Sequence, residues 1–139
     1  MDNYNRTAHK KYSLNVHLIF VTKYRRKIFN SQEFNTDLKN IMHFIAKKYH
    51  YKIIQMETDI DHIHILLEYK PKDSISNIVK ILKQQSTYYL WLKYNDYLKQ
   101  YFWKKKIIWS EGYFASSIGK VSQKNNRSIY QKPRLKNAT

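Results

Sequence analysis

The strongest constraint on the fold of this 139-residue chain is the order in which strand-like and helix-like hydrophobic patterns follow one another. Residues 13–22 (SLNVHLIFVT) are rich in β-branched and aromatic side chains, and their nearly continuous apolar run is typical of a strand at the centre of a sheet. Apolar residues at helical spacing then predict a helix over residues 31–49, with Ser31 as its N-cap.

The rest of the chain continues this alternation of strands and helices. In order, we expect two strands joined by a short turn, a long helix, an irregular basic segment and a fourth strand: residues 51–58, 62–69, 74–98, 103–110 and 113–118. The order β-α-β-β-α-β predicts a ferredoxin-like α+β sandwich, in which two helices cover one face of a four-stranded antiparallel sheet. A helical segment is expected to follow at the C-terminus.

Composition excludes several classes of protein. The chain has no Cys, which excludes disulfide scaffolds, thiolate-bound zinc and thiol nucleophiles, and its two Gly residues cannot form a glycine-rich phosphate loop. No apolar run approaches the ~18 residues of a membrane span, and the polar N-terminus lacks the apolar core of a secretory signal. We therefore expect a cytoplasmic protein with one domain over residues 1–139: a polar arm (1–11), a core (12–122) and a C-terminal segment with a basic tail (123–139).

Charge is the first indication of a partner. The chain carries 26 Lys and Arg against 10 Asp and Glu, a formal charge of +16. This excess favours nucleic acid, although a Lys-rich surface also serves solubility and could meet a ribosome or an acidic membrane. Thirteen Tyr add rings that either stack on unpaired bases or pack at the rim of the core. The candidate DNA contacts form two basic runs, for which a solvated loop is the alternative: Lys23, Tyr24, Arg25, Arg26, Lys27, Lys104, Lys105 and Lys106.

The triplet His62-Ile63-His64 is the strongest local signal of chemistry. Side chains alternate between the faces of a strand, so both imidazoles should project from one face while Ile63 and Ile65 face the core. Two such imidazoles can reach one cation, although a His-x-His triplet also arises by chance. Without Cys they do not complete a structural zinc site, but they suit a catalytic Mg²⁺ or Mn²⁺ with open positions for phosphate oxygens. His17 faces either the core or the sheet surface.

Three blocks of the sequence carry a resemblance to a known family. They are residues 21–29 (VTKYRRKIF), residues 61–64 (DHIH) and residues 109–122 (WSEGYFASSIGKVS). With these blocks in this order, the chain resembles the single-tyrosine HUH transposases of the IS200/IS605 group from about Tyr12 to Ser122.

The resemblance implies an enzyme that acts on single-stranded DNA at insertion-sequence ends, where it recognises imperfect hairpins. His62 and His64 would bind a divalent cation, Mg²⁺ or Mn²⁺, that polarises the scissile phosphate. The hydroxyl of Tyr130, in a C-terminal helix, would attack and leave a 5′-phosphotyrosine linkage and a free 3′-OH. The family acts as homodimers without a nucleotide cofactor, and a prokaryotic, nucleoid-associated protein is expected.

The C-terminal segment departs from the family pattern. The family has a Gln four residues after the tyrosine as a third metal ligand, whereas this chain has Arg134 there. The nearest Gln is Gln131, which on a helix points about 100° away from Tyr130. Pro133 would end a helix at this point. The third ligand is therefore left open.

Three alternatives to an active transposase of this group follow from the same residues. One is a non-catalytic single-stranded nucleic-acid-binding module of the RRM type, which stacks bases on aromatic side chains of its central strands. Another is a decayed transposase that binds DNA without cleaving it. The third is a related nickase of the replication-initiator or relaxase type.

Overall fold

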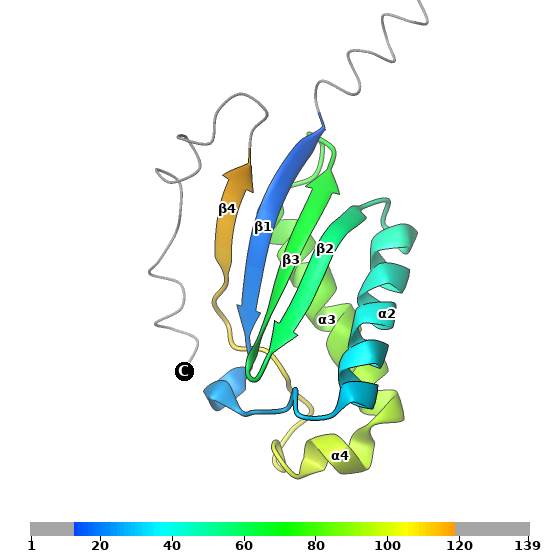
Figure 1. Ribbon diagram of the computed structural model, residues 1–139, viewed down its shortest axis with the longest axis vertical. Helices are drawn as coiled ribbons and strands as arrows, with labels where there is room; N and C mark the ends of the chain where they lie inside the picture. Colours follow the sequence, from blue (N-terminus) through cyan, green and yellow to red (C-terminus); the bar gives the residue numbers. More distant parts are fainter. Residues whose placement is uncertain (1–12, 119–139) are drawn as a thin grey trace, which may run out of the picture.

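The computed structural model describes residues 13–118, which form a four-stranded antiparallel sheet with helices on one face (Figure 1). The strand order is β2-β3-β1-β4, so β1 and β3 are central. The strands are β1 (Leu14–Val21), β2 (Lys52–Asp59), β3 (His62–Tyr69) and β4 (Phe114–Ile118). The helical elements are η1 (Lys23–Arg25), α2 (Gln32–Lys48), α3 (Ile75–Lys93) and α4 (Asn95–Lys99). The predicted ferredoxin-like α+β sandwich is confirmed.

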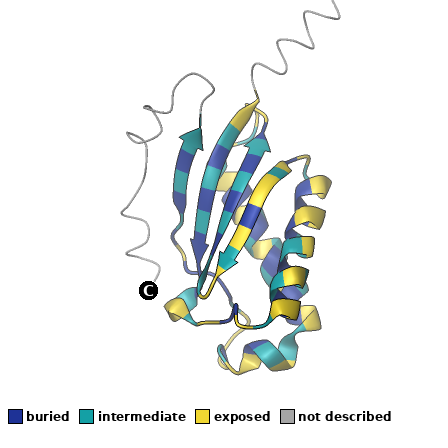
Figure 2. Cartoon of the chain, viewed as in Figure 1, coloured by how far each residue is buried: buried dark blue, intermediate teal, exposed yellow. Residues whose placement is uncertain are grey.

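The hydrophobic core lies between the sheet and helices α2 and α3. On β3, Ile63, Ile65 and Leu67 are fully buried, whereas the residues between them are only partly buried, an alternation visible in Figure 2. Each of the two long helices adds one apolar face, with Leu38 and Leu82 at full burial. Within residues 13–118 no helix lies over the opposite face of the sheet (Figure 1), which we call the open face.

Local capping chemistry explains where the long helices begin. The Ser31 hydroxyl accepts a hydrogen bond from the Phe34 backbone N–H at 3.1 Å, which confirms the predicted N-cap of α2. The Ser74 hydroxyl accepts from the Asn77 backbone N–H at 3.1 Å in the same way at the start of α3. Each cap satisfies a backbone donor that the first helical turn leaves unpaired.

The prediction of one unbroken helix to Leu98 is wrong. Helix α3 ends at Lys93, and Tyr94 has φ −117° and ψ 37°, outside the helical region, before the short α4 begins. The reason is tertiary: the Tyr94 hydroxyl donates to the Asp37 carboxylate on α2, and its ring packs edge-on against Phe34. Redirecting the chain at this point also lets Leu98 reach full burial.

The predicted hairpin between the second and third strands is confirmed. Strand β2 ends at Asp59, β3 begins at His62, and the two are paired there. Ile60 in the connecting turn has φ 27°. The turn meets the end of β1, because the Thr22 backbone N–H donates to the Asp61 carbonyl oxygen at 2.9 Å. The hairpin tip and the segment after β1 therefore lie together at one end of the sheet.

Two further observations concern the chain as a whole. None of the helices found among residues 13–118 has the length and apolar character needed to cross a membrane. The expected polar arm (1–11) and the expected C-terminal segment (123–139) lie outside the described residues.

Candidate functional site

The His62 and His64 side chains share the open face of the sheet, as the alternation of β3 predicts. Their ring centroids are 4.9 Å apart, and both residues are partly buried. Ile63 and Ile65 point into the core at full burial. The predicted orientation of the pair is thus confirmed, whereas cation binding stays a prediction.

Each imidazole of the pair has a hydrogen-bond partner at its Nδ1 atom. His62 Nδ1 lies 3.0 Å from Asp61 Oδ1, and His64 Nδ1 lies 3.3 Å from His17 Nε2. A carboxylate can only accept a hydrogen bond, so His62 donates its Nδ1–H and keeps the Nε2 lone pair free when it is neutral. When His64 donates its Nδ1–H to His17 Nε2, its own Nε2 lone pair is free in the same way. Metal-binding histidines commonly use this arrangement, with one nitrogen oriented by a neighbour and the other on the ion.

His17 is the residue to which the sequence analysis assigned no role. It lies on the open face of β1, and its ring stacks on His64 at 5.3 Å between centroids and 26° between planes. The signal that would have identified it is the register of β1 against β3, in which His17 lies opposite Leu66 and His64 lies opposite Ile19. Register between strands distant in sequence is not visible in the sequence of either strand.

The surroundings of His64 favour its neutral form. Burial lowers the pKa of His64, and repulsion from His62 and His17 lowers it further, while Asp59 acts in the opposite direction. Burial also lowers the pKa of His17. Neutral imidazole is the form that binds metal ions, so the electrostatics of the site fit a cation ligand.

The donor set among the described residues fits an incomplete cation site. Within residues 13–118, no group of three or more His, Cys, Asp or Glu side chains is placed to bind a metal ion. His62 and His64 therefore offer two nitrogen ligands, which fits a divalent cation completed by phosphate oxygens, water or further side chains. A hollow of about 470 Å³ on the open face adjoins His64, and it is lined by His17, Gln55, Met56, Glu57, His64, Leu66 and Ile118.

The C-terminal residues of the predicted site cannot be placed. Tyr130, expected as the nucleophile, and Gln131 and Arg134, which bear on the third ligand, lie outside the described residues. Their roles stay predictions.

The two basic runs, about 80 residues apart in the sequence, lie side by side in the structure. The Lys23 backbone N–H donates to the Ile108 carbonyl oxygen at 2.7 Å, and Thr22 forms an isolated β-bridge with Trp109. Arg25 Nε lies 3.6 Å from Asp61 Oδ2, on the carboxylate that also accepts from His62. The candidate DNA contacts and the imidazoles therefore share one end of the sheet.

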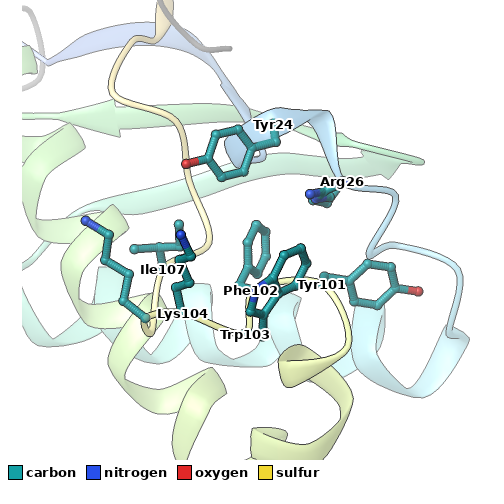
Figure 3. A pocket seen from close by; sticks show the side chains of 8 residues that line it. Tyr24, Arg26, Tyr101, Phe102, Trp103, Lys104 and Ile107 are labelled. Atoms are coloured by element: carbon teal, nitrogen blue, oxygen red, sulfur yellow. The ribbon is translucent and has the colours of Figure 1, made fainter.

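An aromatic pocket lies where the two basic runs meet (Figure 3). Its volume is about 240 Å³, and the lining residues are Tyr24, Arg26, Tyr101, Phe102, Trp103, Lys104, Lys105 and Ile107. The predicted contacts Tyr24, Arg26, Lys104 and Lys105 belong to this lining. The three aromatic residues at 101–103 could not be predicted as part of this site, because their position depends on the path of an irregular segment.

Lys83 is a second residue that sequence reasoning missed. Its Nζ donates to the carbonyl oxygens of Ser110 at 2.7 Å and Gly112 at 2.8 Å. Burial lowers the pKa of the Lys83 amine to about 8, and the negative charge of Glu111 acts in the opposite direction. Lysine side chains are mostly exposed, and nothing in the α3 pattern marks this one as partly buried. Lys83 fixes the segment between the basic run and β4.

Comparison with known proteins gives consistent results. Residues 10–130 match the family described as "Transposase IS200 like". A transposase for insertion sequence element IS200 from Salmonella typhimurium is 30% identical over 84% of this chain and 75% of its own length. The ISDra2 transposase TnpA of Deinococcus radiodurans is 32% identical over 87% of this chain and 81% of its own length.

Solved structures agree at the level of the fold. A candidate transposase from Deinococcus radiodurans has a TM-score of 0.70 and 30% identity, covering 85% of this chain and 86% of its own. A REP-associated tyrosine transposase bound to a REP hairpin has a TM-score of 0.55 and 16% identity, covering 85% of this chain and 62% of its own. At 16% identity the second likeness shows the fold alone.

Proposed function

The chain belongs to the IS200-like transposase family, and from this premise we propose that it cleaves and rejoins single-stranded DNA at insertion-sequence ends through a 5′-phosphotyrosine intermediate. The observation that supports this mechanism best is the pair of imidazoles on the open face. Both of their Nδ1 atoms have partners, and the Asp61 carboxylate links His62 to Arg25 of the basic turn. The proposed cation site and the basic surface that would bind phosphate are thus adjacent, which supports phosphoryl transfer at this end of the sheet.

In the proposed reaction, the Tyr130 hydroxyl loses its proton and its oxygen attacks the scissile phosphorus. The bond from phosphorus to the 3′-oxygen breaks, and that oxygen takes up a proton to become a free 3′-OH. Rejoining is the reverse attack by a 3′-OH, so the phosphodiester energy is conserved and no nucleotide cofactor is needed. A phenol has a pKa near 10, so its attack at neutral pH needs a base or a cation nearby.

His62 and His64 would bind a divalent cation, Mg²⁺ or Mn²⁺, in this reaction. When bound, such an ion neutralises charge on the phosphate oxygens. The contribution of the chain itself is to orient the two rings: Asp61 fixes His62, and His17 fixes His64. The basic residues at the same end of the sheet would bind the neighbouring phosphates.

The proposed substrate is a single strand that carries an imperfect hairpin, and the proposed active form is a homodimer. A REP hairpin is the ligand of the REP-associated tyrosine transposase with a similar fold. Strands β2 and β4 form the edges of the sheet, where backbone groups of a second copy can pair. Light scattering on the purified chain would measure the oligomeric state, and a monomer at working concentrations would contradict the dimer.

The RRM-like alternative is disfavoured by the open face. That kind of module stacks bases on aromatic side chains of its two central strands. On β1 and β3 the open-face side chains are Asn15, His17, Ile19, His62, His64, Leu66 and Glu68. The only tyrosine of these two strands, Tyr69, is buried on the other side. The central strands therefore present imidazoles where such a module presents stacking rings.

The test is a covalent adduct between protein and DNA. We expect the full chain, incubated with hairpin-bearing single strands and Mn²⁺, to form an adduct that survives denaturing electrophoresis. Tyr130→Phe should form none, whereas the control Tyr88→Phe, on an exposed ring of α3, should react normally. His62→Ala should lose the adduct but retain most of its hairpin affinity, because the phosphate contacts remain.

The outcomes that contradict the proposal are distinct. An adduct that persists in Tyr130→Phe would assign the nucleophile to another residue. Hairpin binding with no adduct from the unmodified chain would identify the decayed transposase instead. Equal loss of adduct and hairpin affinity in His62→Ala would make that histidine structural.

A further inference from the structure

The pocket between the two basic runs has the composition of a nucleobase site. We infer that it binds one unpaired base of the single-stranded DNA, stacked on Tyr24 and Trp103. This inference rests on the proposed function, since it supplies the contact by which the chain would select a single strand over a duplex.

The rings that line the pocket are accessible to a ligand. Trp103 is 67% exposed and Tyr24 is 53% exposed, which is unusual for such large side chains on a folded protein. Phe102, by contrast, is buried and lies beside Trp103 in the lining (Figure 3). The pocket thus combines two exposed aromatic rings with a buried one, and exposed rings beside positive charge are the groups on which unpaired bases stack.

The guanidinium of Arg26 lies against both the Tyr24 ring and the Trp103 ring. The Arg26 Cζ atom lies 5.6 Å from the centre of the Tyr24 ring and 5.8 Å from that of the Trp103 ring. Arg26 Nε is buried, and it has no hydrogen-bond partner among residues 13–118. A base entering beside these rings would also meet the charge of this guanidinium, which adds a cation–π contribution to stacking.

The backbone holds Tyr24 over the pocket in a strained conformation. Tyr24 and Arg25 have φ values of 59° and 54°, in the left-handed region that non-glycine residues rarely occupy. The turn is fixed by the Thr22 hydroxyl, which donates to the Arg26 carbonyl oxygen at 2.7 Å, and by the Arg25 backbone N–H, which donates to the Thr22 carbonyl oxygen at 3.0 Å. Strain retained in this way is commonly found at ligand sites, where it preorganises a side chain.

Size and charge select the occupant. At about 240 Å³ the pocket lies below the usual range for whole small-molecule ligands and suits a single heterocycle. Lys104 and Lys105 belong to its lining, so phosphates on either side of an inserted base would meet positive charge. A base within a duplex is stacked on its neighbours and cannot enter, so the occupant is an unpaired base of a DNA strand.

The experiment compares two strands of equal length and charge. One is oligothymidine, and the other is the same strand with every base removed, both bound to the full chain and followed by fluorescence anisotropy. We expect oligothymidine to bind about 5- to 100-fold more tightly, the usual effect of stacking one base. Trp103→Ala and Tyr24→Ala should bring this ratio close to one while leaving the affinity for the abasic strand unchanged.

Two control variants distinguish the loss of base stacking from a general loss of folding. Trp103→Phe retains a ring and should keep most of the ratio, and Tyr88→Ala removes a 59%-exposed tyrosine outside the pocket and should leave the ratio unchanged. Oligothymidine should also quench tryptophan fluorescence, because Trp91 and Trp109 are buried and Trp103 is the exposed member of the three. The quenching should disappear in Trp103→Phe.

A ratio near one for the unmodified chain, or a ratio that Trp103→Ala leaves intact, would overturn the inference. If the Tyr130-dependent adduct still forms in that case, the inference fails alone and the proposed function stands. If the ratio and its dependence on Trp103 hold but no adduct forms, the base site stands and the proposed function fails.

Discussion

His64 contacts a histidine on either side, and the two contacts differ in kind. The His62 ring, from the same strand, faces it edge-on at 4.9 Å, as two ligands of one ion can do. The His17 ring, from the neighbouring strand, stacks on it and approaches its Nδ1 atom. The first contact fits shared metal binding, and the second fits orientation of the ring. The two roles can be separated by mutation.

Replacing His17 tests this division. His17→Ala removes the partner of the His64 Nδ1–H, and we expect the affinity of the DNA-free chain for Mn²⁺ to fall about 10- to 100-fold, the usual effect of losing a residue behind a metal ligand. His17→Gln retains a side-chain acceptor and should recover most of that affinity. His43→Ala, at an exposed histidine of α2, is the matched control. Calorimetry that finds equal Mn²⁺ affinity in His17→Ala and the unmodified chain would exclude this role.

At the scale of elements, α3 fixes the irregular segment that carries the second basic run. Lys83 donates to two carbonyl oxygens of that segment, and the Trp91 indole N–H donates to the Ile107 carbonyl oxygen at 3.1 Å. The Trp109 indole N–H donates to the Ser86 hydroxyl at 2.9 Å. These contacts lie along one side of the helix, so α3 determines where the segment runs even though the segment has no regular structure of its own.

The partly buried amine of Lys83 should give stability a measurable pH dependence. Its pKa is about 8 in the folded chain and near 10.4 when unfolded, so between these values the unfolded chain binds more protons and stability rises with pH. The rise should be on the order of 1–2 kcal/mol, reduced from the full linkage value because the amine is only partly buried. We expect Lys83→Met, which does not titrate, to lack it. Urea denaturation from pH 7 to pH 10 measures the difference between the two proteins, and a flat difference would contradict the assignment.

The elements could be predicted from sequence wherever their determinants are local. The alternation in β3 gave the orientation of His62 and His64, and Ser31 marked the start of α2. The break at Tyr94 could not be predicted, because it depends on the contact between Tyr94 and Asp37 on another helix.

The same distinction applies to the candidate site, of which one part could be predicted from the sequence and another could not. The basic runs were visible as charge, but their meeting at one pocket depends on the pairing of residues near Thr22 and Trp109. His17 and Lys83 were missed because a strand register and a buried loop contact give them their roles. Tertiary contacts of this kind leave no periodic signal in the sequence.

At the scale of the whole molecule, this chain of net charge +16 carries exposed lysines at both ends of the sheet. Lys104, Lys105 and Lys106 are exposed beside the basic turn, at the end of the sheet that holds the imidazoles. Lys47, Lys48 and Lys52 are exposed where α2 leads into β2, at the opposite end in Figure 1. The first trio lies where the proposed substrate would bind, and the second does not.

Salt dependence should distinguish the two trios. Affinity for single-stranded DNA should fall linearly on a plot of log K against log salt concentration, with a slope of about −0.7 per phosphate contact. Replacing Lys104, Lys105 and Lys106 with Ala should reduce the steepness by about 2, since three contacts are lost. Replacing Lys47, Lys48 and Lys52 removes the same charge and should barely change the slope. Equal effects of the two triple variants would mean that DNA responds to total charge alone.

Strand β3 builds the core with one set of side chains and the site with the other. A deletion or insertion of one residue within it would turn the isoleucines outward and the imidazoles inward at once. Mutants of this kind would lose folding and chemistry together. Selection that preserves the fold would therefore also preserve the site, and the reverse. We therefore expect changes in length to be confined to the connections between strands, and the pair of imidazoles to be inherited as a fixed part of the scaffold.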